Sequence, residues 1–218
     1  QVAAASAATP AYERKLFRWE DVTHPLVGVC PKLAVADATT EWTTTWDTKT
    51  VETLCGHRVG RVSLVPATCY IEMVTPIVRQ LHGDTPFSLQ NLQFVNILYL
   101  SVGKTPTVRI SLTEGTAIKI ESLTESTGQW TLHASMNLQM EPTGNEHPKL
   151  DIAAVKARCP EVRPGGEEFY TKIGNDYQGH FRSVSEIFLG DDELLCCVEI
   201  DPDTLQGMPD LCAMAWLD

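Results

Sequence analysis

The residues best suited to chemistry lie in the stretch 55–73, CGHRVGRVSLVPATCYIEM. His57 is flanked by Gly56 and Gly60, which permit tight turns, and it stands nine residues before Pro66. Pro66 suits a first helical turn, and the N–H groups at a helix start can polarise a carbonyl oxygen. For a lone histidine, a turn residue that only hydrogen-bonds the backbone is the simpler interpretation. Beside a helix start, the pattern also fits a proton acceptor acting on a carbonyl compound.

The helix expected after Pro66 must position this histidine. Its apolar residues recur at helical spacing, and Gly83 ends the run; they are Tyr70, Met73, Val74, Ile77, Val78 and Leu81. A wide apolar face with few charges predicts a helix that other elements enclose.

The stretch resembles the first motif of the dehydratase domain of modular polyketide synthases and of the related fatty acid synthases. That motif is a histidine, three residues, a glycine, four residues and a proline. His57 and Pro66 keep the full spacing, while Arg61 occupies the glycine position and Gly60 lies one residue before it. The resemblance implies that His57 is the proton acceptor. Backbone N–H groups at the start of the helix, at Val65 or Ala67, could meet the oxygen of a developing enolate, so Val65, Pro66 and Ala67 are expected to contact the substrate.

Three further segments resemble motifs of the same family. THPLVG (23–28) is similar to the opening HPLLG, and WTLHAS (130–135) is similar to WxxHAxG. His24 is expected to mark its motif without taking part in catalysis, and His133 is expected to be structural. The segment Tyr177-Gln-Gly-His-Phe181 resembles Y-G-P-x-F with its aromatic residues kept, which implies that Tyr177 and Phe181 contact the substrate.

The acid of the family is an aspartate in an HPxLLD run. AMAWLD matches the end of that run, so the resemblance implies that Asp218 is the proton donor. A second register places Met208-Pro209 on the His-Pro pair and puts Ala213 at the aspartate position. We prefer Asp218, because this register keeps a reactive group. A protonated Asp218 requires an apolar environment, which the preceding AMAWL residues could provide.

Periodicity predicts an α+β fold with one central helix. Strands are expected at 41–46, leading through Thr53 and Leu54 to the His57 turn, and then over 87–100, 108–112, 118–120 and 130–140. A short helix over 167–174 and a hairpin of 181–189 with 193–200 should follow. The resemblance implies a double hot-dog, in which antiparallel sheet wraps a central helix. The expected division is an interdomain linker (1–20), the N-terminal hot-dog (21–141), a linker (142–166) and the start of a truncated C-terminal hot-dog (167–218).

The function that the resemblance implies is loss of water from a 3-hydroxyacyl thioester to give a 2,3-enoyl thioester. The substrate would be tethered through phosphopantetheine to an acyl carrier protein, with no cofactor or metal on this domain. Acyltransferase and ketoreductase domains would be neighbours, and homodimers are common in the family. Two alternatives remain open: a product-template-type domain that directs cyclisation, and a catalytically silent scaffold. A separate hydrolase or oxidoreductase is disfavoured, because G-x-S-x-G, G-x-G-x-x-G and P-loop motifs are absent.

Composition indicates which kinds of partner and which cellular compartment the protein has. The 218 residues carry 17 basic and 28 acidic side chains, a net charge of −11, which argues against a nucleic-acid binder. No apolar run approaches membrane-spanning length. The seven cysteines are odd in number and lack C-x-x-C spacing, which favours free thiols in a reducing, cytoplasmic compartment.

Overall fold

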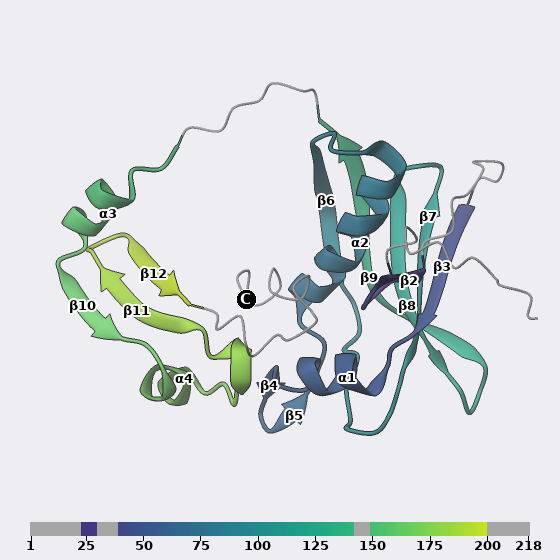
Figure 1. Cartoon of the computed structure of the whole chain (residues 1–218), viewed down its shortest axis with the longest axis horizontal. Helices are drawn as coiled ribbons and strands as arrows, with labels where there is room; N and C mark the ends of the chain where they lie inside the picture. Colours follow the sequence, from purple (N-terminus) through teal and green to yellow (C-terminus); the bar gives the residue numbers. More distant parts are fainter. Residues whose placement is uncertain (1–22, 30–38, 142–148, 200–218) are drawn as a thin grey trace, which may run out of the picture.

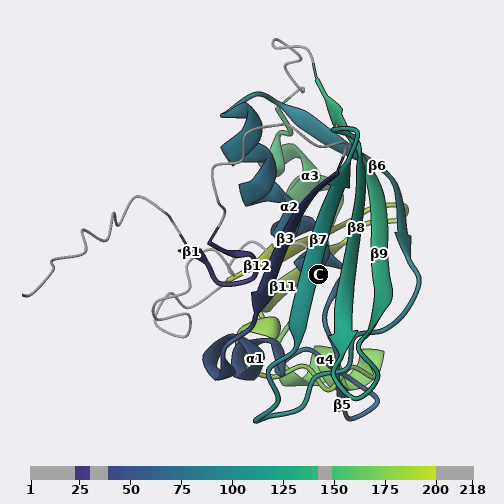
Figure 2. The same ribbon diagram turned by 90° about the vertical axis from the view of Figure 1, so that its right-hand side faces the viewer.

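The computed structural model describes residues 23–29, 39–141 and 149–199. Its main unit is a five-stranded antiparallel sheet with helix α2 (Ala67–His82) lying along one face (Figure 1). Figure 2 shows the strands side by side, with α2 behind them. The strand order is β3 (Thr39–Thr45), β7 (Thr107–Thr113), β8 (Ala117–Thr124), β9 (Gln129–Met140) and β6 (Phe87–Phe94). This is the hot-dog arrangement expected for the N-terminal half.

Helix α2 forms where periodicity predicts it. Pro66 is its N-cap residue and Gly83, at φ 64°, its C-cap residue. The buried residues of α2 include Cys69, Met73, Val74, Ile77 and Val78, and they join one core with apolar residues of the sheet. Each such side chain contributes about 1.5–3 kcal/mol when it leaves water. Burial of one helix face therefore fixes α2, and with it the turn that precedes the helix.

The segment between β3 and the His57 turn differs from the expectation of a strand leading directly to it. Helix α1 (Thr48–Leu54) lies there, and the Asp47 side chain caps it by accepting a hydrogen bond of 2.7 Å from the Thr50 N–H. Seven residues are too few for helical periodicity to stand out, so the cap is the only local signal. Buried Val51 and Leu54 attach α1 to the core.

His24 links the first hairpin to the central helix. It ends β1 (Thr23–His24), which pairs with β2 (Gly28–Val29). Its Nδ1 accepts from the Leu26 N–H at 3.3 Å, so Nε2 carries the hydrogen and lies 3.3 Å from Oε1 of Glu72 on α2. The imidazole thus ties the first hairpin to the central helix.

His133 is buried, with 3% of its surface exposed, although it alternates with the polar residues of its strand. A register shift between Ile120 and Glu121 accounts for this, because β9 gains an extra residue there. Its Nδ1 donates to the Asn96 carbonyl at 3.0 Å, and Nε2 accepts from the Ser122 hydroxyl at 2.7 Å. Burial lowers the pKa of His133, although Asn96 and Glu121 oppose the effect.

Acidification below about pH 6.5 is expected to destabilise the protein through His133. The ordinary histidine pKa is 6.5, and the folded value is lower, so the unfolded chain binds more protons as the pH falls through this range. Stability should therefore decrease from neutral pH towards acid. Urea unfolding at several pH values measures the slope. His133→Gln should lose about 1 kcal/mol at neutral pH and show a shallower slope, whereas an equal slope would contradict this account.

The second half contains a three-stranded antiparallel sheet of β10 (Glu161–Pro164), β11 (Val184–Leu189) and β12 (Leu194–Val198). The expected hairpin is confirmed as β11 and β12, and the expected short helix as α4 (Glu167–Ile173). The expectation of a linker over 142–166 is wrong in part, because α3 (Ile152–Arg158) and β10 lie within it and β10 pairs with β11. The Pro and Gly residues around the four-residue strand β10 masked its pattern.

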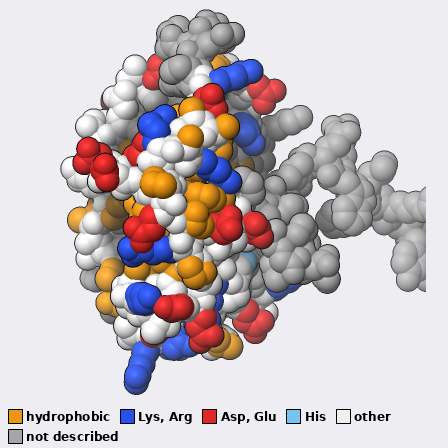
Figure 3. Space-filling model, turned by 90° about the vertical axis from the view of Figure 1, so that its left-hand side faces the viewer, with side chains coloured by type: hydrophobic (Ala, Val, Ile, Leu, Met, Phe, Trp, Pro, Cys, Tyr) orange, Lys and Arg blue, Asp and Glu red, His pale blue; other side chains and the backbone are white. Residues whose placement is uncertain are grey.

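Within the described residues, the second half is an incomplete hot-dog. Among its described residues, the sheet is accompanied by two helices of seven residues, α3 and α4, and a short 3₁₀ turn, η1 (Gly179–Phe181). Figure 3 shows this side of the molecule, where hydrophobic side chains alternate with charges of both signs. Val162 and Leu194 are among its exposed apolar residues. None of the helices in the described part is long and apolar enough to cross a membrane.

Candidate active site

His57 lies in a short connection between α1 and α2. Its backbone N–H bonds the Leu54 carbonyl at the end of α1, and its carbonyl accepts from the Leu64 N–H at 3.1 Å. Between these anchors, β4 (Arg58–Val59) and β5 (Val62–Ser63) form a small hairpin. The connection holds the imidazole inside the protein, with only 6% of the residue exposed.

The hairpin explains how the turn tolerates Arg61 at the position where the family has glycine. Gly60 has φ 56° and Arg61 has φ 68°, and a two-residue hairpin turn of this kind requires positive φ at both central positions. Arg61 therefore adopts a backbone conformation that glycine adopts at lower cost. The register of His57 and Pro66 is unaffected by the change.

The hydrogen bonds of His57 determine its tautomer. Nδ1 lies 2.9 Å from the Leu64 carbonyl, which can only accept, so Nδ1 carries the hydrogen. Nε2 lies 3.0 Å from the Tyr177 hydroxyl and accepts from it. A neutral imidazole with its basic lone pair on Nε2 is the form that a proton acceptor requires.

Tyr177 and Phe181 reach His57 from the second half of the chain. Their ring centroids lie 4.8 and 5.5 Å from the imidazole. The backbone joins the halves as well, since the Gln178 N–H donates to the Gly56 carbonyl at 2.8 Å and the Asp176 N–H donates to the Arg58 carbonyl at 3.1 Å. The site is thus built from both halves, and the aromatic residues expected near the substrate lie beside the expected base.

Gly56 permits this close approach. A Cβ added there would lie 2.7 Å from the Gln178 carbonyl oxygen and 3.0 Å from a ring carbon of Phe181. The first of these atoms belongs to the backbone and cannot rotate away. A glycine directly before the histidine is therefore a requirement of the contact between the two halves.

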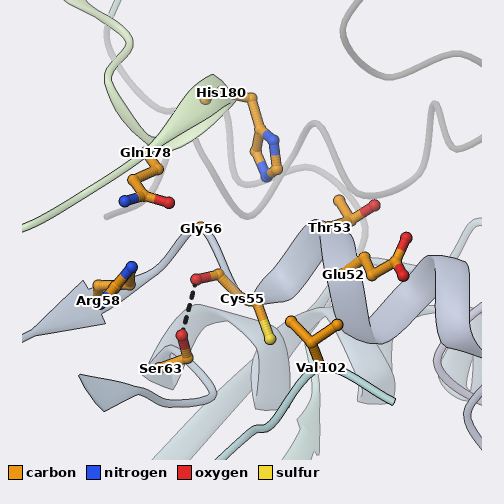
Figure 4. Close-up of a pocket in the computed structure, with 10 residues that line it drawn as sticks. Glu52, Thr53, Cys55, Gly56, Arg58, Ser63, Val102, Gln178 and His180 are labelled. Carbon is orange, nitrogen blue, oxygen red and sulfur yellow. Dashed lines mark hydrogen bonds between the residues drawn. The ribbon is translucent and has the colours of Figure 1, made fainter. Parts of the chain in front are cut away.

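A polar cavity of about 460 Å³ opens beside the turn (Figure 4). Cys55, Ser63, Gln178 and His180 are among its lining residues. The Ser63 hydroxyl donates to the Cys55 carbonyl at 2.9 Å. Burial raises the pKa of the Cys55 thiol and lowers the pKa of His180, so both groups remain neutral near pH 7. A thiol in this state is a poor nucleophile.

The start of α2 meets the sequence expectation only in part. The Val65 N–H donates to the Leu98 carbonyl at 3.0 Å, so it is not the available donor that a carbonyl-binding role would need. Ala67 is the first residue of α2, where helix geometry leaves the N–H without a partner inside the helix. Val65 and Ala67 also line an apolar cavity of about 220 Å³.

The structure brings His57, Tyr177 and Phe181 together and places Val65, Pro66 and Ala67 at the adjoining helix start. Asp218, and the alternative at Ala213, lie outside the described residues. The sequence could not predict that the Leu64 carbonyl orients His57, because every residue has a backbone carbonyl. In the described part of the chain, no group of three His, Cys, Asp or Glu residues could hold a metal ion.

Tyr177→Phe is expected to remove the donor to Nε2 while keeping the ring. The free energy of unfolding should fall by about 1 kcal/mol, because a shielded acceptor loses its partner. The nitrogen NMR signal of Nε2 should shift, since this atom loses the hydrogen bond. Tyr170→Phe is the matched control. The Tyr170 hydroxyl accepts a hydrogen bond of 3.1 Å from the Val184 N–H and makes none to the imidazole. An unchanged Nε2 signal in Tyr177→Phe would contradict the assigned contact.

The sequence is similar to those of known proteins. Residues 24–127 match the family model described as polyketide synthase dehydratase domain. A curated relative, the highly reducing polyketide synthase lcsB of Purpureocillium lilacinum, is 27% identical over 153 residues, which are 67% of this chain. The match spans only 6% of the length of that relative.

Solved structures show the same fold. The dehydratase domain from the CurF module of curacin polyketide synthase aligns with TM-score 0.77 and 22% identity, over 90% of this chain and 74% of that one. The CurK dehydratase domain gives TM-score 0.74 at 22% identity, over 89% and 72%. A trans-AT polyketide synthase dehydratase domain from Brevibacillus brevis gives TM-score 0.71 at 18% identity, over 90% and 75%.

Proposed function

We propose, from the premise that residues 24–127 belong to the polyketide synthase dehydratase family, that this chain removes water from a 3-hydroxyacyl thioester to form a 2,3-enoyl thioester. The observation that carries the proposal is the fixed tautomer of His57. Its Nδ1 hydrogen is held by the Leu64 carbonyl, which leaves the Nε2 lone pair towards Tyr177 in the junction of the two halves.

The reaction needs two proton transfers. His57 Nε2 takes a proton from carbon 2, and the electrons of that bond form the double bond between carbons 2 and 3. The bond from carbon 3 to oxygen breaks, and a proton donor converts the departing hydroxyl into water. Negative charge develops on the thioester oxygen while the proton leaves carbon 2, and the Ala67 N–H at the start of α2 is the donor proposed to meet it.

Asp218 is the proposed proton donor. Its match to the end of the family's HPxLLD run supports the assignment. A carboxyl group must be protonated to perform this step, which requires that its surroundings disfavour the charged form. An Asp218 that titrates as an ordinary exposed carboxyl group would contradict the role.

The proposed partner is an acyl carrier protein whose phosphopantetheine arm presents the thioester. Acyltransferase and ketoreductase domains are proposed as neighbours within a longer synthase. No cofactor is proposed for this domain, because acid and base groups suffice for the two proton transfers. The carrier protein would have to deliver the acyl group to the junction between the halves, where Tyr177 and Phe181 lie beside His57.

The test is to load a carrier protein with a 3-hydroxyacyl group, add the protein and follow the intact mass of the carrier. Loss of one water is the expected result. An unchanged mass, with circular dichroism showing a folded protein, would reject dehydration and favour a silent scaffold. A cyclised product from a longer polyketone substrate would instead favour the product-template alternative.

A further inference from the structure

The hydroxyl of Tyr70 is an unusual group for a protein core. Tyr70 lies one helical turn into α2, with 4% of its surface exposed. Its hydroxyl has no hydrogen-bond partner among the described residues. Buried polar groups are nearly always paired, and an unpaired one costs about 1–3 kcal/mol. The position therefore carries a cost that phenylalanine would avoid.

Tyr70 lines the cavity of about 220 Å³ that begins at Leu64, Val65 and Ala67. The lining also includes residues 94–97, at the end of β6 and just after it. The lining is mostly apolar. Burial raises the pKa of Tyr70, so its hydroxyl remains a neutral donor at any working pH. A ligand in this cavity could satisfy the hydroxyl with an acceptor atom.

Helix geometry brings a second donor to the same place. Ala67 and Tyr70 are three residues apart and share one helix face, and a helical side chain points back towards the N-terminus. The Tyr70 side chain therefore extends over the first turn, where the Ala67 N–H has no partner within the helix. A hydroxyl and an amide that approach one acceptor oxygen form a site for a carbonyl that gains negative charge.

We infer that the Tyr70 hydroxyl and the Ala67 N–H together bind the thioester carbonyl oxygen of the acyl substrate in this cavity. The inference rests on the proposed dehydration, for which it adds Tyr70 as a substrate-binding residue. The cavity lies beside the His57 turn, because Leu64 lines it and the Leu64 carbonyl accepts from His57 Nδ1. Carbon 2, which gives up the proton, is bonded to the carbonyl carbon. The site that binds the carbonyl oxygen must therefore lie near the base.

The Tyr70 ring is held independently of its hydroxyl. It stacks against Phe94 and His133, with centroids at 6.1 and 6.4 Å. Tyr70→Phe should preserve these contacts and remove only an unpaired polar atom. The melting temperature should stay the same or rise, while kcat/KM for dehydration should fall on the order of 10², as for loss of one donor to a developing oxyanion.

The decisive experiment is infrared spectroscopy of crotonyl-pantetheine, isotopically labelled at the carbonyl carbon and bound to the full chain. The carbonyl band should lie at lower frequency on the wild-type protein than on Tyr70→Phe. Tyr99→Phe is the matched control, because that hydroxyl belongs to a residue 62% exposed and should leave the band unchanged.

Equal bands in wild type and Tyr70→Phe, or the absence of a bound band in the wild type, would overturn the inference. A lower melting temperature of Tyr70→Phe with an unchanged band would show a purely structural hydroxyl and would also overturn it. The spectrum does not require turnover. A band that depends on Tyr70 in a protein that removes no water would therefore uphold the carbonyl site and reject the proposed dehydration.

Discussion

Replacing His57 by alanine is expected to reduce dehydration of a carrier-bound 3-hydroxyacyl group on the order of 10³-fold, the usual contribution of a positioned acid or base. The loss follows from the tautomer, because Nε2 is the acceptor atom of the imidazole and the proposed site of proton transfer. Intact-mass measurement of the carrier protein over time gives the rate.

His82→Ala is the matched control for this prediction. His82 is an exposed histidine in the last turn of α2, so its removal should leave the rate unchanged. Asp218→Asn tests the second proton transfer with the same assay and should also reduce the rate strongly. Full activity of His57→Ala would remove the base from the mechanism, and full activity of Asp218→Asn would remove the acid and reopen the register that places Ala213 there.

Gly56→Ala is expected to separate the two halves of the site. The added methyl group would lie 2.7 Å from the Gln178 carbonyl oxygen, so the segment carrying Tyr177 and Phe181 must move. Overpacking of this kind costs about 1–3 kcal/mol of stability. The rate of dehydration should also fall, because Tyr177 and Phe181 shift relative to His57. Hydrogen exchange at the Gln178 amide, which donates to the Gly56 carbonyl, should become faster.

Gly83→Ala separates this local effect from a general loss of stability. Gly83 caps α2 at φ 64° and has no neighbouring atom within 4 Å of an added Cβ, so alanine there is strained but touches no part of the site. It should destabilise the protein without changing the rate per folded molecule or the exchange of the Gln178 amide. Equal effects of the two substitutions would mean that Gly56 contributes only stability.

The sequence is most informative where apolar side chains recur at regular spacing. Helix α2 and strands β7 to β9 follow from regular apolar spacing, because burial of one face imposes the period. Helix α1 and strand β10 were missed, since elements of seven and four residues are too short to show a period. The burial of His133 could not be predicted from the sequence, because it results from a bulge in its strand, and a bulge leaves no mark in the alternation of apolar and polar residues.

The site was predictable to the extent that it depends on residue types. His57, Tyr177 and Phe181 were identified from spaced motifs, and the structure brings them together. Backbone groups were beyond prediction, because their roles depend on tertiary contacts. The Leu64 carbonyl orients the imidazole and the Leu98 carbonyl occupies the Val65 N–H, yet neither residue type indicates this. Tyr70 was counted only as a core residue, since periodicity does not reveal an unpaired hydroxyl.

The hydrogen bond between His57 and Tyr177 spans 120 residues of sequence. Closing so long a loop costs more chain entropy than forming the neighbouring hairpins β7–β8 and β8–β9. The central sheet is therefore expected to assemble early in folding, while the imidazole is still open to solvent, and the aromatic cover is expected to arrive late. During synthesis, His57 would leave the ribosome well before Tyr177 and Phe181. The proposed site would therefore form only when the second half has docked.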